Sequence, residues 1–151
     1  MLERAESIDA LSPDPCGKYV MGRTWLSFFA KHGRFSGTIV WGAPTPEDVQ
    51  AWTACADFRL SDACSPHATL FDASKVERLS PSAFGVISEY ASRRLAVLEA
   101  RITRLAVVHR GEFAGAVAAG FTKLVSVPFP AETFRDETEA NLLKRPFAQN
   151  V

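Results

Sequence analysis

ATLFDASKVERLSPSAFGVI, residues 68–87, is the stretch that decides the fold. It opens on a short apolar run at residues 68–71 that is typical of a buried strand, and residues 72–74 follow as a loop. Ser80 and Pro81 then begin a helix, because a serine hydroxyl caps free backbone N–H groups and a proline fits the first helical turn. The stretch therefore predicts a strand, a loop and a helix in direct succession.

The chain downstream continues to alternate helix and strand. Apolar residues at helical spacing extend the helix to residue 102: Phe84, Ile87, Ala91, Leu95, Leu98 and Ile102. Residues 105–108 are a continuous apolar run, which predicts a central strand covered on both faces. A helix with one apolar side is expected after Gly111, then a short strand at residues 132–134 and a final helix at residues 136–144.

Upstream, two runs rich in β-branched and aromatic residues predict an opening hairpin. The first spans residues 18–30 and the second residues 38–41, although residues 24–29 are also compatible with a short helix. Thr45 and Pro46 then begin a helix with the same pairing of a capping hydroxyl and a proline. The buried stripe of this helix is expected at Val49, Trp52 and Ala56.

Strands that alternate with helices predict a layered α/β fold. We expect a mixed sheet of four to five strands with flanking helices, in which the strands after Trp41 run largely parallel because crossovers are right-handed. Residues 1–16 combine charges and prolines without an apolar period, which predicts a flexible leader. The folded domain is expected at residues 17–144, and residues 145–151 are expected to form a C-terminal tail or the start of a linker.

Composition and charge limit the classes of function. The 151 residues suit one domain with its own hydrophobic core, and the 17 basic and 17 acidic residues cancel. Direct contact with nucleic acid is not expected, because binding to the phosphate backbone depends on excess positive charge. No apolar run approaches the about 20 residues that span a bilayer, and the N-terminus is too acidic and polar for a signal peptide. We expect a cytoplasmic protein without membrane contact.

The three cysteines, Cys16, Cys55 and Cys64, favour the same compartment. Their odd number and irregular spacing do not fit a disulfide framework. Cys64 and His67 form a C-x2-H pair with Cys55 upstream, but one such pair is a weak metal motif. We therefore expect no metal site, and the sequence implies no cofactor.

Four stretches resemble the STAS-like superfamily, whose type member is the sporulation anti-sigma-factor antagonist SpoIIAA. They are GTIVWGAPTPEDVQAW for a strand, turn and first helix, ATLFDASKVERLSPSAFGVI for the central strand and signature loop, and RLAVVHRGEFAGAVAAGF with AETFRDETEANLL for the last half. Together they fall within residues 36–144. The resemblance implies a STAS-like fold and a non-catalytic regulatory role.

The signature loop departs from the family at one position. The family can carry a phosphorylatable serine there, in a motif of the D-S-S-G-L type, whereas Pro81 stands at the acceptor position here and no glycine follows. Pro81 has no hydroxyl, so the family's phosphorylation switch is not implied at this position. Ser80 and Ser82 are alternative acceptors at a helix N-terminus, where negative charge is tolerated, although the simpler interpretation makes Ser80 an N-cap.

A narrower resemblance combines GRTWLSFF with this α/β region. Together they look like the N-terminal, non-DNA-binding part of certain bacterial AraC-type transcription regulators, with the proline-marked end KRPFAQNV where a linker would begin. This resemblance implies a sensory domain in transcription regulation. The DNA-reading element itself is not encoded in these residues.

Candidate site residues gather at the expected C-terminal ends of the parallel strands. Asp72 and His109 each follow a predicted strand, and ligands of open α/β sheets bind at that edge. Ser74 lies close by, so a Ser-His-Asp hydrolase can be drawn, but the chain lacks a G-x-S-x-G elbow and an oxyanion element. We expect no enzyme active site. The candidate surface for a ligand or partner consists of Asp72, Ser74, Ser80, Ser82, His109 and Arg110.

The densest aromatic stretch lies near the N-terminus and supplies the candidate interface. It consists of Trp25, Phe28, Phe29 and Phe35. Core packing is the simpler interpretation of aromatic residues, but Trp41, Trp52 and Phe71 are among the residues already expected to fill the interior. Some of the N-terminal aromatic residues are therefore expected to form a dimer or interdomain contact.

The sequence thus predicts a non-catalytic regulatory or sensory domain that acts through a protein partner, a neighbouring domain or a homodimer. Two alternatives stay open. One is a small-molecule or anion-binding sensor, for which the glycines of HRGEFAG near a helix start are a candidate. The other is a cryptic hydrolase.

Overall fold

The computed structural model describes residues 1–109 and 131–134. The predicted helices after Gly111 and at residues 136–144 lie outside these residues, as do Arg110 and the predicted tail at residues 145–151.

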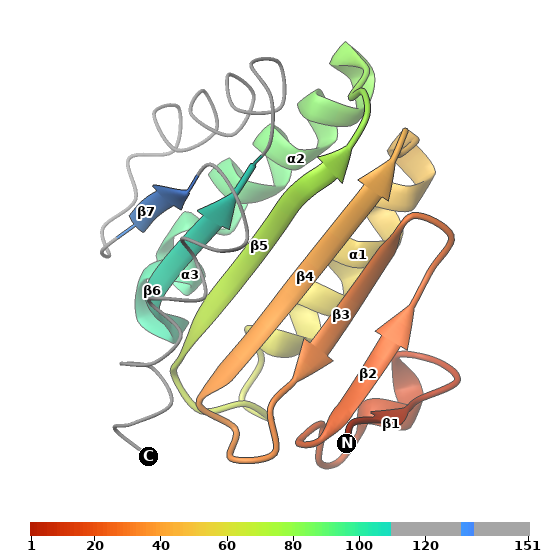
Figure 1. Ribbon diagram of the computed structural model, residues 1–151. Helices are drawn as coiled ribbons and strands as arrows, with labels where there is room; N and C mark the ends of the chain where they lie inside the picture. Colours follow the sequence, from red (N-terminus) through yellow and green to blue (C-terminus); the bar gives the residue numbers. More distant parts are fainter. Residues whose placement is uncertain (110–130, 135–151) are drawn as a thin grey trace.

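A mixed sheet organises the described part of the chain (Figure 1). Its strands are β1 (Glu3–Arg4), β2 (Lys18–Met21), β3 (Trp25–Phe29), β4 (Phe35–Gly42), β5 (His67–Val76), β6 (Ile102–Val108) and β7 (Ala131–Phe134). They lie side by side in sequence order. The pairs β2–β3 and β3–β4 are antiparallel, whereas β1–β2 and every pair from β4 to β7 are parallel. The predicted α/β class and the parallel second half are confirmed.

The sheet has seven strands within the described residues, more than the four to five expected. One reason is the segment 18–30, which was predicted as a single strand of a hairpin. Gly22 lies in a turn that divides it into β2 and β3, and the Gly22 N–H donates to the Trp25 carbonyl at 2.8 Å. The alternative of a short helix at residues 24–29 is wrong, because β3 occupies that segment.

The helices begin where the capping residues predict. In α1 (Pro46–Arg59), the Thr45 side chain accepts from the Asp48 N–H and the Asp48 carboxylate accepts from the Thr45 N–H, which is a capping box. In α2 (Pro81–Arg93), the Ser80 hydroxyl accepts from the Ala83 N–H at 3.1 Å. Both predicted helix starts are confirmed.

The single helix expected up to residue 102 is wrong in its second half. The chain instead forms α2, then α3 (Leu95–Arg101), and Ile102 already begins β6, where it pairs with His67. Ile102 falls at helical spacing, but it is buried as a strand residue, and this is why the spacing predicted too long a helix. The strand over residues 105–108 is confirmed, and three consecutive buried residues, Ala106 to Val108, show that both faces of β6 are covered there.

The helices α1, α2 and α3 lie on one face of the sheet, behind it in Figure 1. Alternate residues of β3 point to this covered face: Trp25, Ser27 and Phe29 are buried, and the intervening residues are half-buried. The core between sheet and helices includes Val40, Val49, Trp52 and Cys55. The Trp52 and Phe71 rings lie 6.0 Å apart across the boundary between α1 and β5. Cys55, rather than the predicted Ala56, completes the buried stripe of α1.

A polar seam runs through this covered face. The hydroxyls of Ser27 and Thr38 are hydrogen-bonded at 3.0 Å, and Arg59 donates from one nitrogen to the Gly37 carbonyl and the Thr38 hydroxyl. The Arg59 guanidinium lies 5.7 Å from the centre of the Phe29 ring, and the described residues give this buried cation no ion pair. The seam fixes the end of α1 over β3 and β4 by directed bonds as well as by apolar packing.

The N-terminal segment is packed, which differs from the loose leader that its composition predicts. Ala5 and Leu11 belong to the core cluster, and β1 adds to the sheet edge beside β2. The Glu3 N–H donates to the Gly17 carbonyl at 2.7 Å, and the Ala5 N–H donates to the Tyr19 carbonyl at 2.8 Å. Two apolar anchors and these backbone bonds order the segment despite its charges.

Candidate functional site

Asp72 and Ser74 do not lie in a loop, as the sequence led us to expect. β5 continues to Val76, and its register pairs Asp72 with Ile39 on one side and with Val108 on the other. Asp72 is only 3% exposed. Its carboxylate accepts from the Ser74 N–H at 2.9 Å, the local bond that an aspartate makes in turns, here inside a strand. β6 pairs with β5 only as far as Asp72, whereas β4 continues to pair with it up to Val76 after a register shift. The Asp-Ala-Ser signal for a turn therefore appears as an irregularity within a strand.

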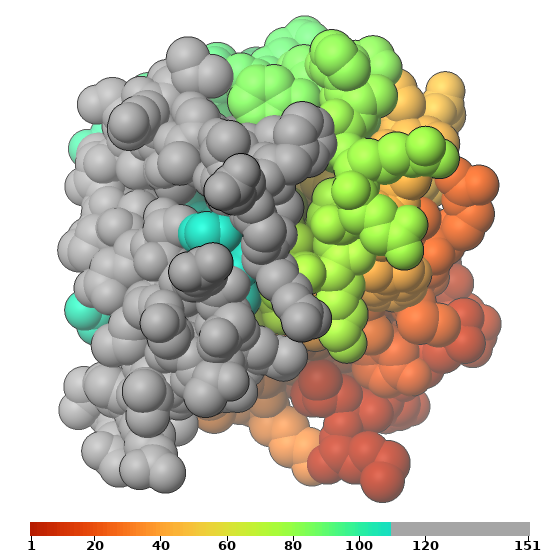
Figure 2. Space-filling model, turned by 45° about the horizontal axis from the view of Figure 1, so that its top comes forward, coloured from red at the N-terminus to blue at the C-terminus, as the bar shows by residue number. Residues whose placement is uncertain are grey.

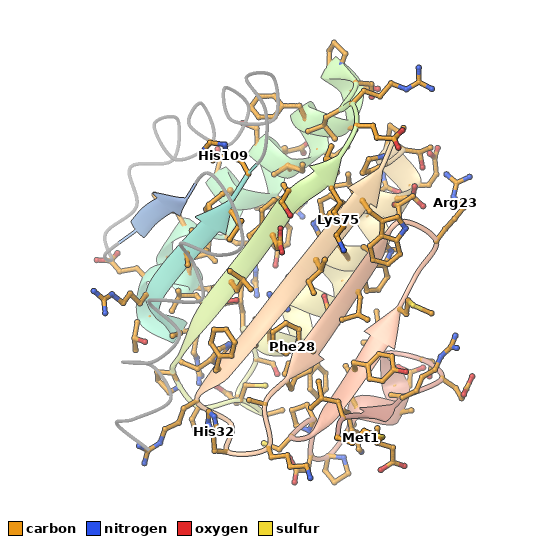
Figure 3. All side chains as sticks on the ribbon, viewed as in Figure 1. Met1, Arg23, Phe28, His32, Lys75 and His109 are labelled. Atoms are coloured by element: carbon orange, nitrogen blue, oxygen red, sulfur yellow. The ribbon has the colours of Figure 1, made fainter. Side chains whose placement is uncertain are left out.

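His109, labelled in Figure 3, follows β6 directly and lies one residue beyond Val108, which pairs with Asp72. Its buried Nδ1 has no hydrogen-bond partner among the described residues, and none of their hydrogen bonds links the Ser74 hydroxyl to the imidazole. A hydrolytic triad requires both links. Within the described residues, the three side chains therefore form no Ser-His-Asp relay.

Ser80 and Ser82 lie at the exposed start of α2. Their hydroxyls are 3.1 Å apart, and Ser80 also caps the helix, as the simpler interpretation predicts. The yellow-green chain around the end of β5 and the start of α2 lies at the molecular surface in Figure 2. No described hydrogen bond joins either serine to Asp72 or His109. The predicted surface thus does not form one site among the described residues: Asp72 is buried, Ser74 and His109 are half-buried, and Ser80 and Ser82 lie at an exposed helix start. The sixth residue, Arg110, lies outside the described residues.

The four candidate aromatic residues divide between the two faces of the sheet. Trp25 and Phe29 are 4% and 3% exposed and belong to the core under α1. Phe28 and Phe35 lie on the opposite face, where both are half-buried and their ring centres are 5.6 Å apart. Figure 3 shows Phe28 in front of the sheet, with α1 behind it. Two of the four side chains are therefore core residues, and of the two on the other face Phe35 also packs against the buried cluster of Leu70, Ala106 and Val108.

Five further residues lie with Phe28 and Phe35 on this face, which we call the helix-free face because none of the described helices covers it. The register pairs Tyr19 with Phe28, Met21 with Leu26, and Leu26 with Ile39, and the pleat turns Trp41 to the same side as Ile39. Met21 is 41% exposed and the other four are half-buried. We call this set the open-face patch: Tyr19, Met21, Leu26, Phe28, Phe35, Ile39 and Trp41. In Figure 2 the β3 and β4 part of this side, in orange, lies at the surface.

Gly37 keeps the surface of the patch flat at its centre. It pairs with Phe28, and a Cβ at position 37 would lie 2.5 and 2.6 Å from two atoms of the Phe28 ring. The ring therefore lies flat over the glycine, as aromatic residues often do beside a glycine in a neighbouring strand. A flat apolar surface results, in place of a ridge.

The alternation of residues along β3 and β4 is a sequence signal that separates the residues of the patch from those of the core. Residues of WLSFF alternate between faces with the period of two that a strand imposes, and Trp41 alternates with Val40 in the same way. We had placed Trp41 in the interior. Which of the two faces is covered depends on the side on which α1 crosses, and residue spacing alone does not give that side.

The three cysteines are free, and burial raises the pKa of each thiol, in the case of Cys64 to about 11. They are consequently protonated near neutral pH, whereas nucleophilic or metal-binding cysteines need the thiolate. Among the described residues no group of three His, Cys, Asp or Glu side chains could hold a metal ion. Within the same residues no helix is long and apolar enough to cross a membrane.

Comparison with known proteins identifies the fold. No protein-family model matches the sequence, and no curated protein matches it. The structure is similar to the crystal structure of an uncharacterised protein of the DUF3478 family from Shewanella loihica PV-4, described as having a SpoIIAA-like fold. The two share a TM-score of 0.54 and 18% sequence identity over 72% of this chain and 82% of that chain. The chain therefore has a SpoIIAA-like fold, as its sequence predicts.

Proposed function

We propose that the protein is a non-catalytic regulatory domain that works by protein–protein contact through the open-face patch, and that a second copy of the chain occupies this patch. The observation that carries the proposal is a row of large apolar side chains left half-exposed on the helix-free face of β2 to β4. Contiguous apolar patches on a protein surface mark interaction sites. The SpoIIAA-like fold supports the regulatory class but does not identify a partner.

The size of the patch sets the strength expected of the contact. The strands β2, β3 and β4 have 4, 5 and 8 residues. With strands about 4.8 Å apart and an advance of about 3.3 Å per residue, together they cover roughly 270 Å². A stable interface of standard size covers about 800 Å² on each partner. The patch can thus form the apolar centre of an interface but not the whole of one. We expect self-association in the range of tens of micromolar, with surrounding polar residues completing the contact.

A second copy fits this surface in shape and in charge. Sheets pack face to face about 10 Å apart, and a second helix-free sheet face has the flat form that suits this one. The basic and acidic residues of the chain are equal in number, so two copies do not repel each other at long range through net charge. A two-fold axis would place the same patch on both sides of the interface.

Sedimentation velocity over a concentration series tests the proposal, with the variant Phe28→Glu as the probe. The wild type should show a sedimentation coefficient that rises with concentration, whereas Phe28→Glu should remain monomeric because a carboxylate would be buried without a partner. Ala51→Glu is the matched control, since residue 51 is exposed on α1, on the other side of the sheet. This control should associate like the wild type.

Two results would overturn the proposed occupant. A wild type that stays monomeric up to about 1 mM would exclude a dimer of useful strength at this patch. Equal association of the wild type and Phe28→Glu would place the dimer contact elsewhere. In the first case a neighbouring domain would be the occupant that remains to be tried.

The regulatory context is proposed from sequence resemblance alone. We propose that the domain belongs to a bacterial transcription regulator of the AraC type and works in the cytoplasm, which agrees with its three free cysteines. The test is the gene that encodes the chain. A helix-turn-helix segment encoded in the same reading frame supports this context, and its absence contradicts it.

A further inference from the structure

Methionine is rare in this chain, and one of its two methionines lies in the open-face patch. The two residues are Met1 and Met21. Met21 ends β2 and pairs with Leu26, which in turn pairs with Ile39, so the three side chains form one row across β2, β3 and β4. The preceding residue, Val20, belongs to the core under the helices, which places Met21 on the helix-free face. A thioether therefore lies in the surface that we propose for the contact.

Met21 is also the most accessible member of the patch. It is 41% exposed, whereas the other six residues are half-buried. A dissolved peroxide can therefore reach its sulfur in the monomer. The three thiols compete poorly for such an oxidant, because burial raises their pKa and keeps them protonated. Met1 is exposed as well, but it lies near the start of β2 (Figure 3), whereas Met21 ends that strand.

An interface of standard size would cover Met21. The patch has an area of roughly 270 Å² and such an interface covers about 800 Å² on each partner, so a contact centred on Phe28 reaches the end of β2. Oxidation converts the thioether to a sulfoxide, which is a strong hydrogen-bond acceptor. Leu26 and Ile39, the neighbours of Met21 in its row, have no polar side-chain group that could donate to it. Burial of an acceptor without a donor weakens an interface.

We propose that Met21 is an oxidation site that controls self-association through the open-face patch, and this inference rests on the function proposed above. A peroxide ROOH transfers one oxygen atom to the sulfur: an S–O bond forms, the O–O bond breaks, and the proton of the transferred oxygen leaves with the other oxygen as ROH. The sulfur is oxidised by two electrons and the peroxide is reduced by two. The reverse step requires a dithiol, which becomes a disulfide while the oxygen leaves as water.

Sedimentation velocity before and after treatment with hydrogen peroxide tests the proposal. The matched variant is Met21→Leu, which nearly conserves the apolar volume and keeps Met1 and the three cysteines. The oxidised wild type should associate roughly tenfold more weakly than the untreated protein, because each copy brings one sulfoxide into the contact. Met21→Leu should associate equally before and after treatment. Equal weakening of both proteins would locate the effect at another residue and overturn the proposal.

Peptide mass spectrometry follows the two methionines separately. Trypsin releases Met1 within residues 1–4 and Met21 within residues 19–23. With peroxide in excess, oxidation of Met21 should be roughly fivefold slower at about 500 µM protein than at about 5 µM, because a dimer with a Kd of tens of micromolar protects it. Met1 should react equally fast at both concentrations, and Phe28→Glu should remove the protection of Met21. An equal rate for Met21 at both concentrations in an associating wild type would place it outside the contact and overturn the proposal.

Enzymatic repair separates the sulfoxide from other products of oxidation. Methionine sulfoxide reductases supplied with dithiothreitol should restore the association of the oxidised wild type, because they return the thioether. Dithiothreitol alone should leave it weak, since this reagent reduces disulfides. Recovery with dithiothreitol alone would assign the loss to cysteine and overturn the proposal.

The proposed contact and the proposed oxidation site fail in different ways. An untreated wild type that stays monomeric contradicts the contact, and the role of Met21 falls with it. An untreated wild type that associates, and that associates equally well once mass spectrometry shows Met21 to be fully oxidised, contradicts the role of Met21 alone.

Discussion

The two faces of the sheet differ in how deeply they bury neighbouring residues of the same kind. Phe28 and Phe29 are adjacent and chemically identical, yet Phe29 is buried under α1 and Phe28 lies half-exposed on the helix-free face. The covered face combines apolar packing with the Ser27, Thr38 and Arg59 seam. On the helix-free face, the apolar side chains of β2 to β4 stay half-exposed, and none of the described helices lies over them. Residue type alone therefore does not distinguish a core position from an interface position. The alternation of side chains along the strand and the side of the sheet on which the helix crosses do.

The largest expected effect comes from truncating a tryptophan on the covered face. Trp25→Ala should lower the free energy of unfolding by about 3–5 kcal/mol, because the buried ring leaves a cavity. Trp41→Ala, on the helix-free face, is the matched control and should cost about 1 kcal/mol, since that ring is already partly in water. Urea denaturation measures both values. Similar losses in the two variants would contradict the division between the faces.

A methyl group added at Gly37 should give an intermediate effect and sharpen the description of the helix-free face. In Gly37→Ala the new Cβ would collide with the Phe28 ring, so the ring must leave its flat position. We expect a loss of about 1–3 kcal/mol in unfolding free energy, as for other overpacked sites, and weaker self-association. Gly85→Ala is the control, because a Cβ there meets no atom within 4 Å. Unchanged sedimentation of Gly37→Ala would show that the flat ring is not part of the contact.

The smallest expected effect is a pH dependence that comes from His67. Its pKa is lowered in the folded state, so the unfolded chain binds a proton more readily, and stability falls as the pH drops below the ordinary value of 6.5. One such proton contributes at most about 1.4 kcal/mol per pH unit. Urea denaturation at about pH 7 and about pH 5 should show that His67→Phe lacks this part of the loss. An identical pH dependence in both proteins would mean that His67 is not held neutral.

Features that depend on neighbouring residues could be predicted from the sequence. Thr45 and Ser80 locate two helix starts because capping is decided within one helical turn, and the apolar run at residues 105–108 locates a central strand. These signals, with the resemblance to the STAS-like superfamily, were enough to predict the fold. Pro81, which stands where the family can have a phosphoacceptor serine, was also correctly predicted to lie in the first turn of a helix.

Features that depend on distant partners could not be predicted in this way. Asp72 and Ser74 have the composition of a turn, but β5 continues through them because β4 pairs with it again at Lys75 and Val76. A cleft of about 730 Å³ at the edge where β4, β5 and β6 begin is built from four separate parts of the chain, near residues 16, 34, 65 and 104, and nothing in the local sequence of any part indicates the others. His67 gave only a weak C-x2-H metal signal, whereas the burial of its Nε2 without a partner among the described residues is visible only in the folded chain.

The most direct test of the central claim compares two neighbouring alanine variants. We assign Phe29 to the packing that holds the fold together and Phe28 to a surface that serves contact. Urea denaturation should therefore show a loss of about 3–5 kcal/mol for Phe29→Ala and about 1 kcal/mol for Phe28→Ala. Equal losses, or a larger loss for Phe28→Ala, would contradict the claim that the two faces of the sheet have separate roles.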